Sequence, residues 1–368
     1  MIYLDNGATS FHKPRSVARA VVRAMEHCAN PGRGGHRPAM EAAAQVLKTR
    51  EKAARLFDCQ PEQVAFTSNC THGLNIAIHT LVKPGSRVAV SGFEHNAVTR
   101  PLHARGCELL VAGRELFTPA DTLSRFEDAL KQGVSAAIFT HISNVFGYIL
   151  PVEEMAALCR KYRVPFVIDA AQSAGVLPVE LKKLKANFIA MPGHKGLLGP
   201  QGTGILLCND QPVPLLQGGT GSESKNQRMP DFLPDTLEAG TVNVPGIAGL
   251  GAGIGYVQQE GLHRIFQREN RQVKRLEKGL KKFGFKAFSG ENQAGTLSFV
   301  PDIDCEEMAE KLARQGIAVR AGLHCAPLAH ESAGSLHTGT VRVSYGMDAC
   351  DGQTDQLLLV LSRIIKNE

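Results

Sequence analysis

Residues 191–204 read MPGHKGLLGPQGTG, which places Lys195 between a histidine and a glycine-rich run. Upstream, residues 167–173 read VIDAAQS, an apolar run typical of a buried strand that ends at Asp169, 26 residues before Lys195. A lysine on such a loop is placed to bind an aldehyde, and an acid at the end of a strand can pair with a ring nitrogen. Pyridoxal 5'-phosphate (PLP) offers both groups, because its aldehyde forms a Schiff base with lysine and its pyridinium nitrogen pairs with an acid. The two stretches therefore predict a PLP site.

Short apolar runs alternate with helical segments from about residue 64 onward, on both sides of this pair. Such βα repetition predicts parallel strands, and strands this apolar suit a sheet that helices cover on both faces. We expect an α/β fold whose large domain holds a mostly parallel seven-stranded sheet. The expected strands are VAFTS (64–68), RVAVSG (87–92), ELLVAG (108–113), AAIFTHIS (136–143), PFVIDAAQS (165–173), NFIAMPG (187–193) and GILLC (204–208).

The chain has 368 residues, which is more than a single compact core usually holds, so we expect two domains. The large PLP-binding domain should span 14–246, with two helices at 14–28 and 38–57 packed outside the sheet or against a partner subunit. The small C-terminal domain should span 247–368 and have an α+β architecture. We expect the N-terminal segment 1–13 to associate with the small domain.

Composition argues against several functional classes. The net charge of +6 is densest in RQVKRLEKGLKKF (271–283), where helical spacing and few aromatics favour a solvated helix face over a nucleic-acid site. The chain shows neither a secretion signal nor an apolar window long enough to cross a membrane, so we expect a cytoplasmic protein without a membrane partner. The nine cysteines are an odd number and form no CxxC pair. We therefore expect free thiols and no metal site.

Polar side chains follow other predicted strands and are candidates for cofactor binding. A helix should begin near Thr71, and helix amino ends bind anions through free backbone N–H groups. Thr71 and His72 are therefore candidates for a phosphate site, although Asn69 or Thr71 could simply cap the helix. His95 lies just past another strand, where its imidazole could stack on a flat ring. The alternative is a surface histidine at a helix start.

Asn144 and Gln172 follow two further strands. Their amides could contact the phenolic oxygen and the ring edge of the cofactor. Each position alone is weak evidence. Together with Thr71 and His95, however, they fall at the same edge of successive strands as the Lys195 loop, which strengthens the case for one shared site.

Nine motifs follow one another along nearly the whole chain. They are DNGATS (5–10), TSNCTHG (67–73), EHNAV (94–98), SNVFG (143–147), DAAQS (169–173), GHK (193–195), EAGT (238–241), RAGLHCAP (320–327) and TVRVSYG (340–346). In this order they resemble the class V aminotransferase family, and within it the cysteine desulfurases and selenocysteine lyases. The resemblance implies a fold type I PLP enzyme that works as a homodimer. It also implies that His95 stacks on the cofactor ring and that Gln172 contacts the phenolate, with Asp169 and Lys195 in the roles given above.

On the phosphate side, the resemblance assigns Thr71 and His194. Thr241 resembles the residue that reaches the phosphate of the neighbouring subunit, so each active site would need two chains. One position departs from the family pattern, because Pro192 stands where the family usually carries a hydroxyl residue. Proline offers neither a hydroxyl nor a backbone N–H. We therefore expect Thr241 or Thr71 to supply the missing hydrogen bond.

Cys325 differs from the other cysteines, most of which we expect to be small buried hydrophobes. It follows His324, lies five residues after Arg320 and sits in a polar loop, and nearby positive groups lower the pKa of a thiol. The segment GLHC resembles the short active-site loop of group II desulfurases, which carry HC at this place. Arg342 resembles the arginine that holds the substrate carboxylate, a role that suits a planar guanidinium. Asn144 is expected on the substrate side as well.

The expected activity is PLP-dependent cysteine desulfuration. L-Cysteine would become L-alanine, and its sulfur would stay on Cys325 as a persulfide until a sulfur-acceptor protein takes it. L-Selenocysteine is a candidate substrate at the same site. We expect Lys195 to act as the base, and His324 and His95 are candidate proton donors.

Three alternatives stay open at this point. Another class V aminotransferase or lyase would use the same PLP residues without needing a thiol, and only the HC loop argues against it. A non-catalytic sulfur carrier or Fe–S scaffold is suggested by the cysteines alone, whose spacing contains no cluster motif. A cysteine hydrolase built on Cys325 with His330 or His337 would leave Lys195 and Asp169 unexplained.

Overall fold

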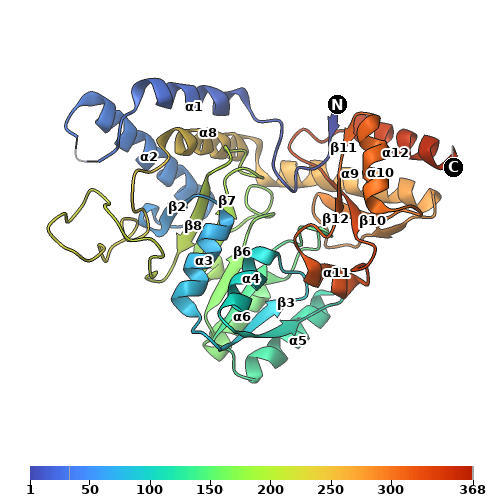
Figure 1. Ribbon diagram of the computed structural model, residues 1–368, viewed down its shortest axis with the longest axis horizontal. Coiled ribbons are helices and arrows are strands. Elements are labelled where there is room, and N and C mark those ends of the chain that lie inside the picture. The colour runs from blue at the N-terminus through green and yellow to red at the C-terminus, as the bar shows by residue number, and fades with distance from the viewer. Residues whose placement is uncertain (33, 367–368) are drawn as a thin grey trace.

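A seven-stranded sheet lies at the centre of the larger part of the molecule (Figure 1). The computed structural model describes residues 1–32 and 34–366. Neighbouring strands are parallel except at β8, which is antiparallel to both β2 and β7. In spatial order the strands are β2 (Val64–Thr67), β8 (Gly204–Cys208), β7 (Phe188–Pro192), β6 (Phe166–Asp169), β5 (Ala136–Thr140), β3 (Arg87–Ser91) and β4 (Glu108–Ala112). The predicted α/β fold with a mostly parallel seven-stranded sheet is confirmed.

Helices cover both faces of this sheet, which explains why its central strands are apolar except near their carboxyl ends, where β5 has Thr140 and β6 has Asp169. Every residue of β5, β6, β7 and β8 is buried, as expected where neither face meets water. One face packs against α3 (Cys70–Leu81) and α4 (Asn96–Ala104). The other face packs against α2 (Arg37–Leu56), α5 (Pro119–Lys131), α6 (Val152–Tyr162), α7 (Leu181–Leu184) and α8 (Val244–Glu260).

A smaller antiparallel sheet forms the second part of the molecule. Its strands, in order, are β12 (Arg320–Gly322), β13 (Thr340–Ser344), β10 (Thr296–Val300) and β9 (Lys286–Phe288). Its core is shared with α9 (Leu262–Lys282), α10 (Cys305–Arg314) and α12 (Asp351–Lys366). The chain begins here too, because β1 (Ile2–Tyr3) pairs in parallel with β11 (Ile317–Ala318) and Leu4 lies fully buried in the same core.

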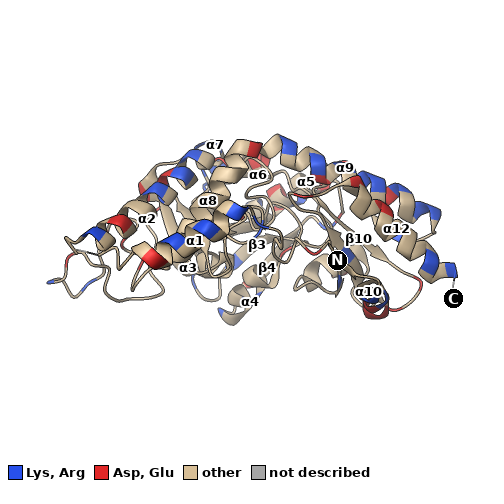
Figure 2. Cartoon of the chain, turned by 90° about the horizontal axis from the view of Figure 1, so that it is seen from above, with Lys and Arg blue, Asp and Glu red and all other residues tan. Residues whose placement is uncertain are grey.

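The passage between the two parts runs through two consecutive helices. Helix α8 packs against α1 (Arg15–His27) and α2, whereas α9 begins directly after Gly261 and packs against α12. The domain boundary expected near residue 246 stays a prediction. Figure 2 shows the basic residues of α9 beside acidic residues of the neighbouring helices, and Arg275 pairs with Asp355 of α12 at 2.7 Å. The charge of this helix is therefore partly neutralised within the chain.

Candidate active site

A cavity lies at the carboxyl edge of the large sheet, where most of the residues predicted for the site meet. Strands β3, β5, β6 and β7 all end there, and helices α3 and α4 begin there. The predicted residues that line the cavity are Thr71, His95, Asn144, Asp169, Gln172, His194 and Lys195, and Asn69, Cys70 and Pro192 line it as well. The predicted site residues His72, Thr241, Cys325 and Arg342 do not line it.

Asp169 is fixed by two hydrogen bonds to the same carboxylate oxygen. Its Oδ1 accepts from the backbone N–H of Ala171 at 2.8 Å and from the thiol of Cys70 at 3.4 Å. Burial raises the pKa of Cys70 well above its ordinary value, and the charge of Asp169 raises it further, so the cysteine stays a thiol and acts as a donor. Among the described residues no donor contacts Oδ2. That oxygen is therefore left for a group in the cavity.

The side chain of Lys195 lines the cavity and ends in an amine without a hydrogen-bond partner among the described residues. Nor does an ion pair join its Nζ to another residue in the described part of the chain. Burial lowers the pKa of Lys195, while the charge of Asp169 acts in the opposite direction. A lowered pKa increases the fraction of neutral amine, which is the form that reacts with an aldehyde or takes up a proton.

His95 is held in one orientation at the start of α4. Its Nδ1 accepts from the backbone N–H of Ala97 at 3.0 Å, so Nε2 is the nitrogen that carries the proton of the neutral ring. Burial lowers the pKa of His95, opposed by the charge of Asp169. The ring is therefore neutral at physiological pH and presents an N–H or a flat face to its surroundings.

The amino end of α3 is capped by its own chain. Asn69 Oδ1 accepts from the backbone N–H of His72 at 2.9 Å, so the capping role considered for Asn69 is the one that the structure has. Thr71 lines the cavity from the first turn of the helix. The assignment of His72 to the cofactor stays a prediction, although its N–H already has this partner.

His194 faces the same end of the cavity and is held by the N-terminal segment. Its Nδ1 lies 3.0 Å from Thr9 Oγ1, and its carbonyl accepts from the backbone N–H and the hydroxyl of Ser10, each at 3.0 Å. Burial lowers the pKa of His194 to about 4, and the charges of Lys195 and Lys13 add to this effect. Pro192 lines the cavity where the family pattern would place a hydroxyl.

Arg342 is a buried cation with a fixed partner. It is 2% exposed, and its Nη2 donates to Asp5 Oδ1 at 2.6 Å. Its Nη1 donates to the Asn144 carbonyl at 3.1 Å, while its Nε has no partner among the described residues. The other oxygen of Asp5 accepts from Arg320 Nε at 3.0 Å. Burial lowers the pKa of Arg342, and Asp5 opposes that shift.

The loop that carries Cys325 is attached to the rim of the cavity at two points. The backbone N–H of Asn96 donates to the Cys325 carbonyl at 2.8 Å, and Asn144 Nδ2 donates to the His324 carbonyl at 2.8 Å. Both His324 and Cys325 adopt positive φ angles of 50° and 56°, a left-handed conformation that bulky side chains seldom adopt. The Cys325 side chain is exposed. The backbone of the loop is thus attached to Asn96 and Asn144, and the thiol that it carries is free.

The positive groups expected beside the thiol are engaged elsewhere, which corrects that part of the sequence argument. The His324 ring turns inward, with Nε2 at 3.1 Å from Thr340 Oγ1, and burial lowers its pKa to about 2. It is therefore a neutral, buried ring. Arg320 is paired with Asp5. Adjacency in sequence was misleading because consecutive residues of a turn point in different directions.

Thr241 lies in a different part of the molecule. It is exposed and lines a separate hollow with Gly32, Leu47 and Glu238, between α2 and the irregular segment before α8. The structure of one chain therefore does not bring Thr241 to Lys195.

Comparison with known proteins identifies the family. A family model described as aminotransferase class-V matches residues 2–357. The chain belongs to the class V aminotransferase family. A probable cysteine desulfurase of Pyrococcus abyssi is 32% identical over 100% of this chain and 95% of that protein. A probable cysteine desulfurase of Methanothermobacter thermautotrophicus is 33% identical over 93% of this chain and 89% of that protein.

A solved structure gives the same result for the fold. The apo structure of a cysteine desulfurase from Thermococcus onnurineus NA1 matches with a TM-score of 0.93 at 32% identity, over 100% of this chain and 95% of that one. Class V aminotransferases are PLP-dependent enzymes, and the α/β architecture described above is that of fold type I. The family predicted from the nine motifs is therefore confirmed.

Sequence reasoning missed two residues of this class V aminotransferase site. Cys70 contacts Asp169 from the start of α3, and Asp5 holds both Arg320 and Arg342. Each lies within a motif used to recognise the family, TSNCTHG or DNGATS. Their roles depend on contacts between distant segments, however, and no local spacing indicates such contacts.

Proposed function

We propose that this class V aminotransferase is a PLP-dependent cysteine desulfurase that converts L-cysteine to L-alanine and retains the sulfur on Cys325. The observation that carries this proposal is the exposed thiol of Cys325, in a loop attached through Asn96 and Asn144 to the rim of the cavity that contains Lys195. An aminotransferase without sulfur chemistry needs no thiol at this place. The names of the relatives point to the same activity.

The residues around the cavity fit PLP. Lys195 has an unpartnered amine whose pKa is lowered by burial, so it suits the cofactor aldehyde. Asp169 Oδ2 would pair with the ring nitrogen, His95 would lie against the ring, and the second N–H of the Gln172 amide is available to the phenolic oxygen, since the first donates to the Gly7 carbonyl at 3.0 Å. When bound, PLP draws electrons away from the α-carbon of an attached amino acid.

The phosphate would lie between the amino end of α3 and His194. The Thr71 hydroxyl and the dipole of α3 favour an anion there. Pro192 contributes no hydrogen bond at this end of the cavity. We assign the compensating hydroxyl to Thr241 of the partner subunit, because this chain's own Thr241 lies in a separate hollow.

Two side chains of the enzyme carry the proposed reaction. Lys195, once free, takes the α-proton as a neutral amine. The Cys325 thiolate then attacks the sulfur of the substrate, so that an S–S bond forms while the C–S bond breaks and its electron pair stays on the carbon fragment, which is protonated to alanine. The persulfide on Cys325 holds the sulfur, and its exposure would let an acceptor protein reach it. L-Selenocysteine would react in the same way through its selenium.

Substrate orientation is assigned to Arg342 and Asn144. A planar guanidinium suits a carboxylate, which favours Arg342 for this role. Its unpartnered Nε is buried and Arg342 lines neither of the two cavities that Lys195 lines, so a side-chain movement would have to open the guanidinium to the substrate. Asn144 connects the two halves of the site, because its amide holds the Cys325 loop and its carbonyl holds Arg342. Movement at Asn144 would therefore displace both the nucleophile and the carboxylate site.

The proposed enzyme is a homodimer. Large apolar side chains are exposed on α1 and α2; they are Val22, Met25, Met40 and Leu47, and Leu47 also lines the hollow of Thr241. Exposed apolar side chains that gather on one surface are typical of subunit interfaces. In the described part of the chain no helix is long and apolar enough to cross a membrane, and the expected cytoplasmic location stays a prediction.

The experiment that tests this function compares two exposed cysteines. We expect Cys325→Ser to lower alanine formation from L-cysteine by at least about 100-fold, because it removes the nucleophile, while leaving the visible absorbance of bound PLP in place. Cys350→Ser, which alters the other exposed cysteine among the described residues, should keep the wild-type rate. Equal rates in the two variants would refute the assignment of the nucleophile. PLP absorbance without alanine in the wild type would indicate transamination or another PLP reaction.

A further inference from the structure

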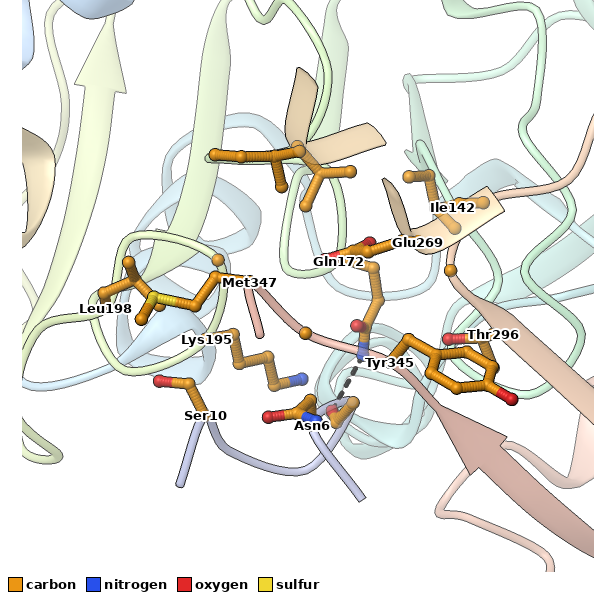
Figure 3. Close-up of a pocket in the computed structure, with 17 residues that line it drawn as sticks. Asn6, Ser10, Ile142, Gln172, Lys195, Leu198, Glu269, Thr296, Tyr345 and Met347 are labelled. Atoms are coloured by element: carbon orange, nitrogen blue, oxygen red, sulfur yellow. Dashed lines mark hydrogen bonds between the residues drawn. The ribbon is translucent and has the colours of Figure 1, made fainter. Parts of the chain in front are cut away.

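The peptide group that precedes Lys195 is held by the N-terminal segment. The carbonyl of His194 accepts from the backbone N–H and from the hydroxyl of Ser10, each at 3.0 Å. Lys13 Nζ lies 3.4 Å from the same oxygen and donates to the Ser10 hydroxyl at 2.7 Å. Ser10 and Lys195 also line one small cavity, and Figure 3 shows Ser10 on the N-terminal segment next to the side chain of Lys195. The segment therefore fixes the backbone of His194.

Thr9, in the same segment, contacts two atoms of His194 at once. Its Oγ1 lies 3.0 Å from His194 Nδ1 and 3.2 Å from the His194 carbonyl oxygen. A threonine hydroxyl has a single proton, so it can donate to only one of these two atoms. The atom that receives this proton decides which nitrogen of the histidine ring carries a hydrogen.

The carbonyl oxygen of His194 already has its donors. A carbonyl oxygen has two lone pairs, and both Ser10 donors lie nearer to it than the Thr9 hydroxyl does. The Ser10 hydroxyl can give its proton to this oxygen because it accepts from Lys13. The proton of Thr9 is therefore left for His194 Nδ1.

A hydrogen bond from Thr9 to Nδ1 places the ring proton of His194 on Nε2. Burial lowers the pKa of His194 to about 4, so the ring is neutral at physiological pH and has only one N–H. With Nδ1 as the acceptor, that group is Nε2–H. No hydrogen bond joins Nε2 to another residue in the described part of the chain, and His194 lines the cofactor cavity. Nε2–H is therefore a donor available to an anion.

We propose that Thr9 is a positioning residue for the cofactor phosphate, because its hydroxyl holds the His194 ring in one orientation and keeps the ring proton on Nε2. This role rests on the proposed function, which places the phosphate between the amino end of α3 and His194. Thr9 does not line the cofactor cavity and acts through the histidine. Pro192 contributes no hydrogen bond at this end of the cavity, so the donor of His194 has fewer others beside it.

Equilibrium binding of PLP and of pyridoxal, which lacks the phosphate, to the apoprotein tests the proposal. Thr9→Val removes the hydroxyl at nearly constant volume, and we expect it to weaken PLP binding by about fivefold, as for the loss of one hydrogen bond. Pyridoxal binding should change by less than about twofold, because only the phosphate end is altered. Thr9→Ser keeps a hydroxyl and should restore PLP binding. Thr118→Val is the matched control, because the Thr118 hydroxyl also donates to a backbone carbonyl at 3.2 Å and lines neither cavity.

A second background shows whether Thr9 acts through His194. In His194→Ala, the further change Thr9→Val should weaken PLP binding by less than about twofold, because the two residues belong to one interaction. Thr9→Ala repeats each measurement with a side chain that cannot crowd the ring.

Three results would overturn the role of Thr9 while leaving the proposed function intact. They are wild-type PLP affinity in both Thr9→Val and Thr9→Ala, an equal loss of PLP and pyridoxal affinity, and an undiminished effect of Thr9→Val in His194→Ala. A wild type that forms no visible band with PLP would overturn the proposed function, and the role of Thr9 with it.

Discussion

Asp169 shows how one neighbouring side chain can adjust a cofactor-binding residue. The Cys70 thiol and the Ala171 N–H both donate to Oδ1, which leaves Oδ2 for the proposed ring nitrogen. Hydrogen bonds to a charged carboxylate stabilise it and weaken its effect on nearby cations. The charge of Asp169 raises the pKa of Lys195, so Cys70 should moderate that effect.

The corresponding prediction uses two substitutions of Cys70. In Cys70→Ala the carboxylate loses a donor and its charge acts more strongly on Lys195, so the pH midpoint of the visible PLP band should rise by about half a pH unit. Cys70→Ser supplies a stronger donor, and its midpoint should lie at or below that of the wild type. A spectroscopic pH titration of both variants measures this. Identical midpoints in all three proteins would show that the thiol has no influence on the site.

At this scale the sequence predicted residues that directly follow strands and missed those that act through other residues. Asp169 and His95 follow apolar runs, so their position at the sheet edge can be read from the pattern. The direction of a side chain within a turn cannot be read in that way. His324 is adjacent to Cys325, yet its ring is buried against Thr340.

Among the elements, the N-terminal segment is the one whose contacts reach farthest. Asp5 accepts from both Arg342 and Arg320, and Ser10 donates to the carbonyl of His194. The first residues of the chain therefore touch the Cys325 side and the phosphate side of the site. Sequence reasoning associated this segment with the small domain but gave it no role in the site, because its contacts join residues 184 to 337 positions apart.

Asp5→Ala should leave the buried Arg342 guanidinium without its ion-pair partner. Removing one member of a buried pair typically costs about 3 to 5 kcal/mol, so we expect the free energy of unfolding to fall by about 3 kcal/mol. Urea denaturation measures the change. Asp348→Ala is the control, because its ion pair with His12 is partly exposed and should contribute at most about 1 kcal/mol. Equal losses in both variants would contradict the role assigned to Asp5.

For the whole molecule, the number of strands and the mostly parallel sheet were predicted from the sequence and are confirmed, whereas the order of the strands was not predicted. The homodimer, expected from the family resemblance alone, stays a prediction. Seven largely apolar runs of five to nine residues are sufficient to indicate a sheet covered on both faces, because strands that are apolar on both sides are typical of buried sheets. Short elements such as β9 (Lys286–Phe288) and α11 (Pro327–Ala333) leave no comparable pattern. Only indirect observations point to a partner subunit. They are the exposed apolar side chains of α1 and α2, and the position of Thr241 away from the cavity that contains Lys195.

The dimer is tested by placing a charge on the exposed face of α2. Leu47 is 53% exposed and lines the hollow that contains Thr241. We expect Leu47→Glu to shift sedimentation from dimer toward monomer and to weaken PLP affinity by at least about tenfold, since the partner's hydroxyl would be lost. Leu359→Glu alters a comparably exposed leucine on α12 and should do neither. A wild type that sediments as a monomer while binding PLP tightly would refute the shared site.

The most direct test of the central claim is to identify the atom that receives the sulfur. The PLP-saturated enzyme is mixed with L-cysteine, quenched with an alkylating reagent, digested and examined by mass spectrometry, with alanine assayed in parallel. We predict that the peptide containing Cys325 carries the mass of one additional sulfur atom and that alanine accumulates. An unmodified Cys325 together with alanine formation, or with the extra sulfur on another cysteine, would contradict the account.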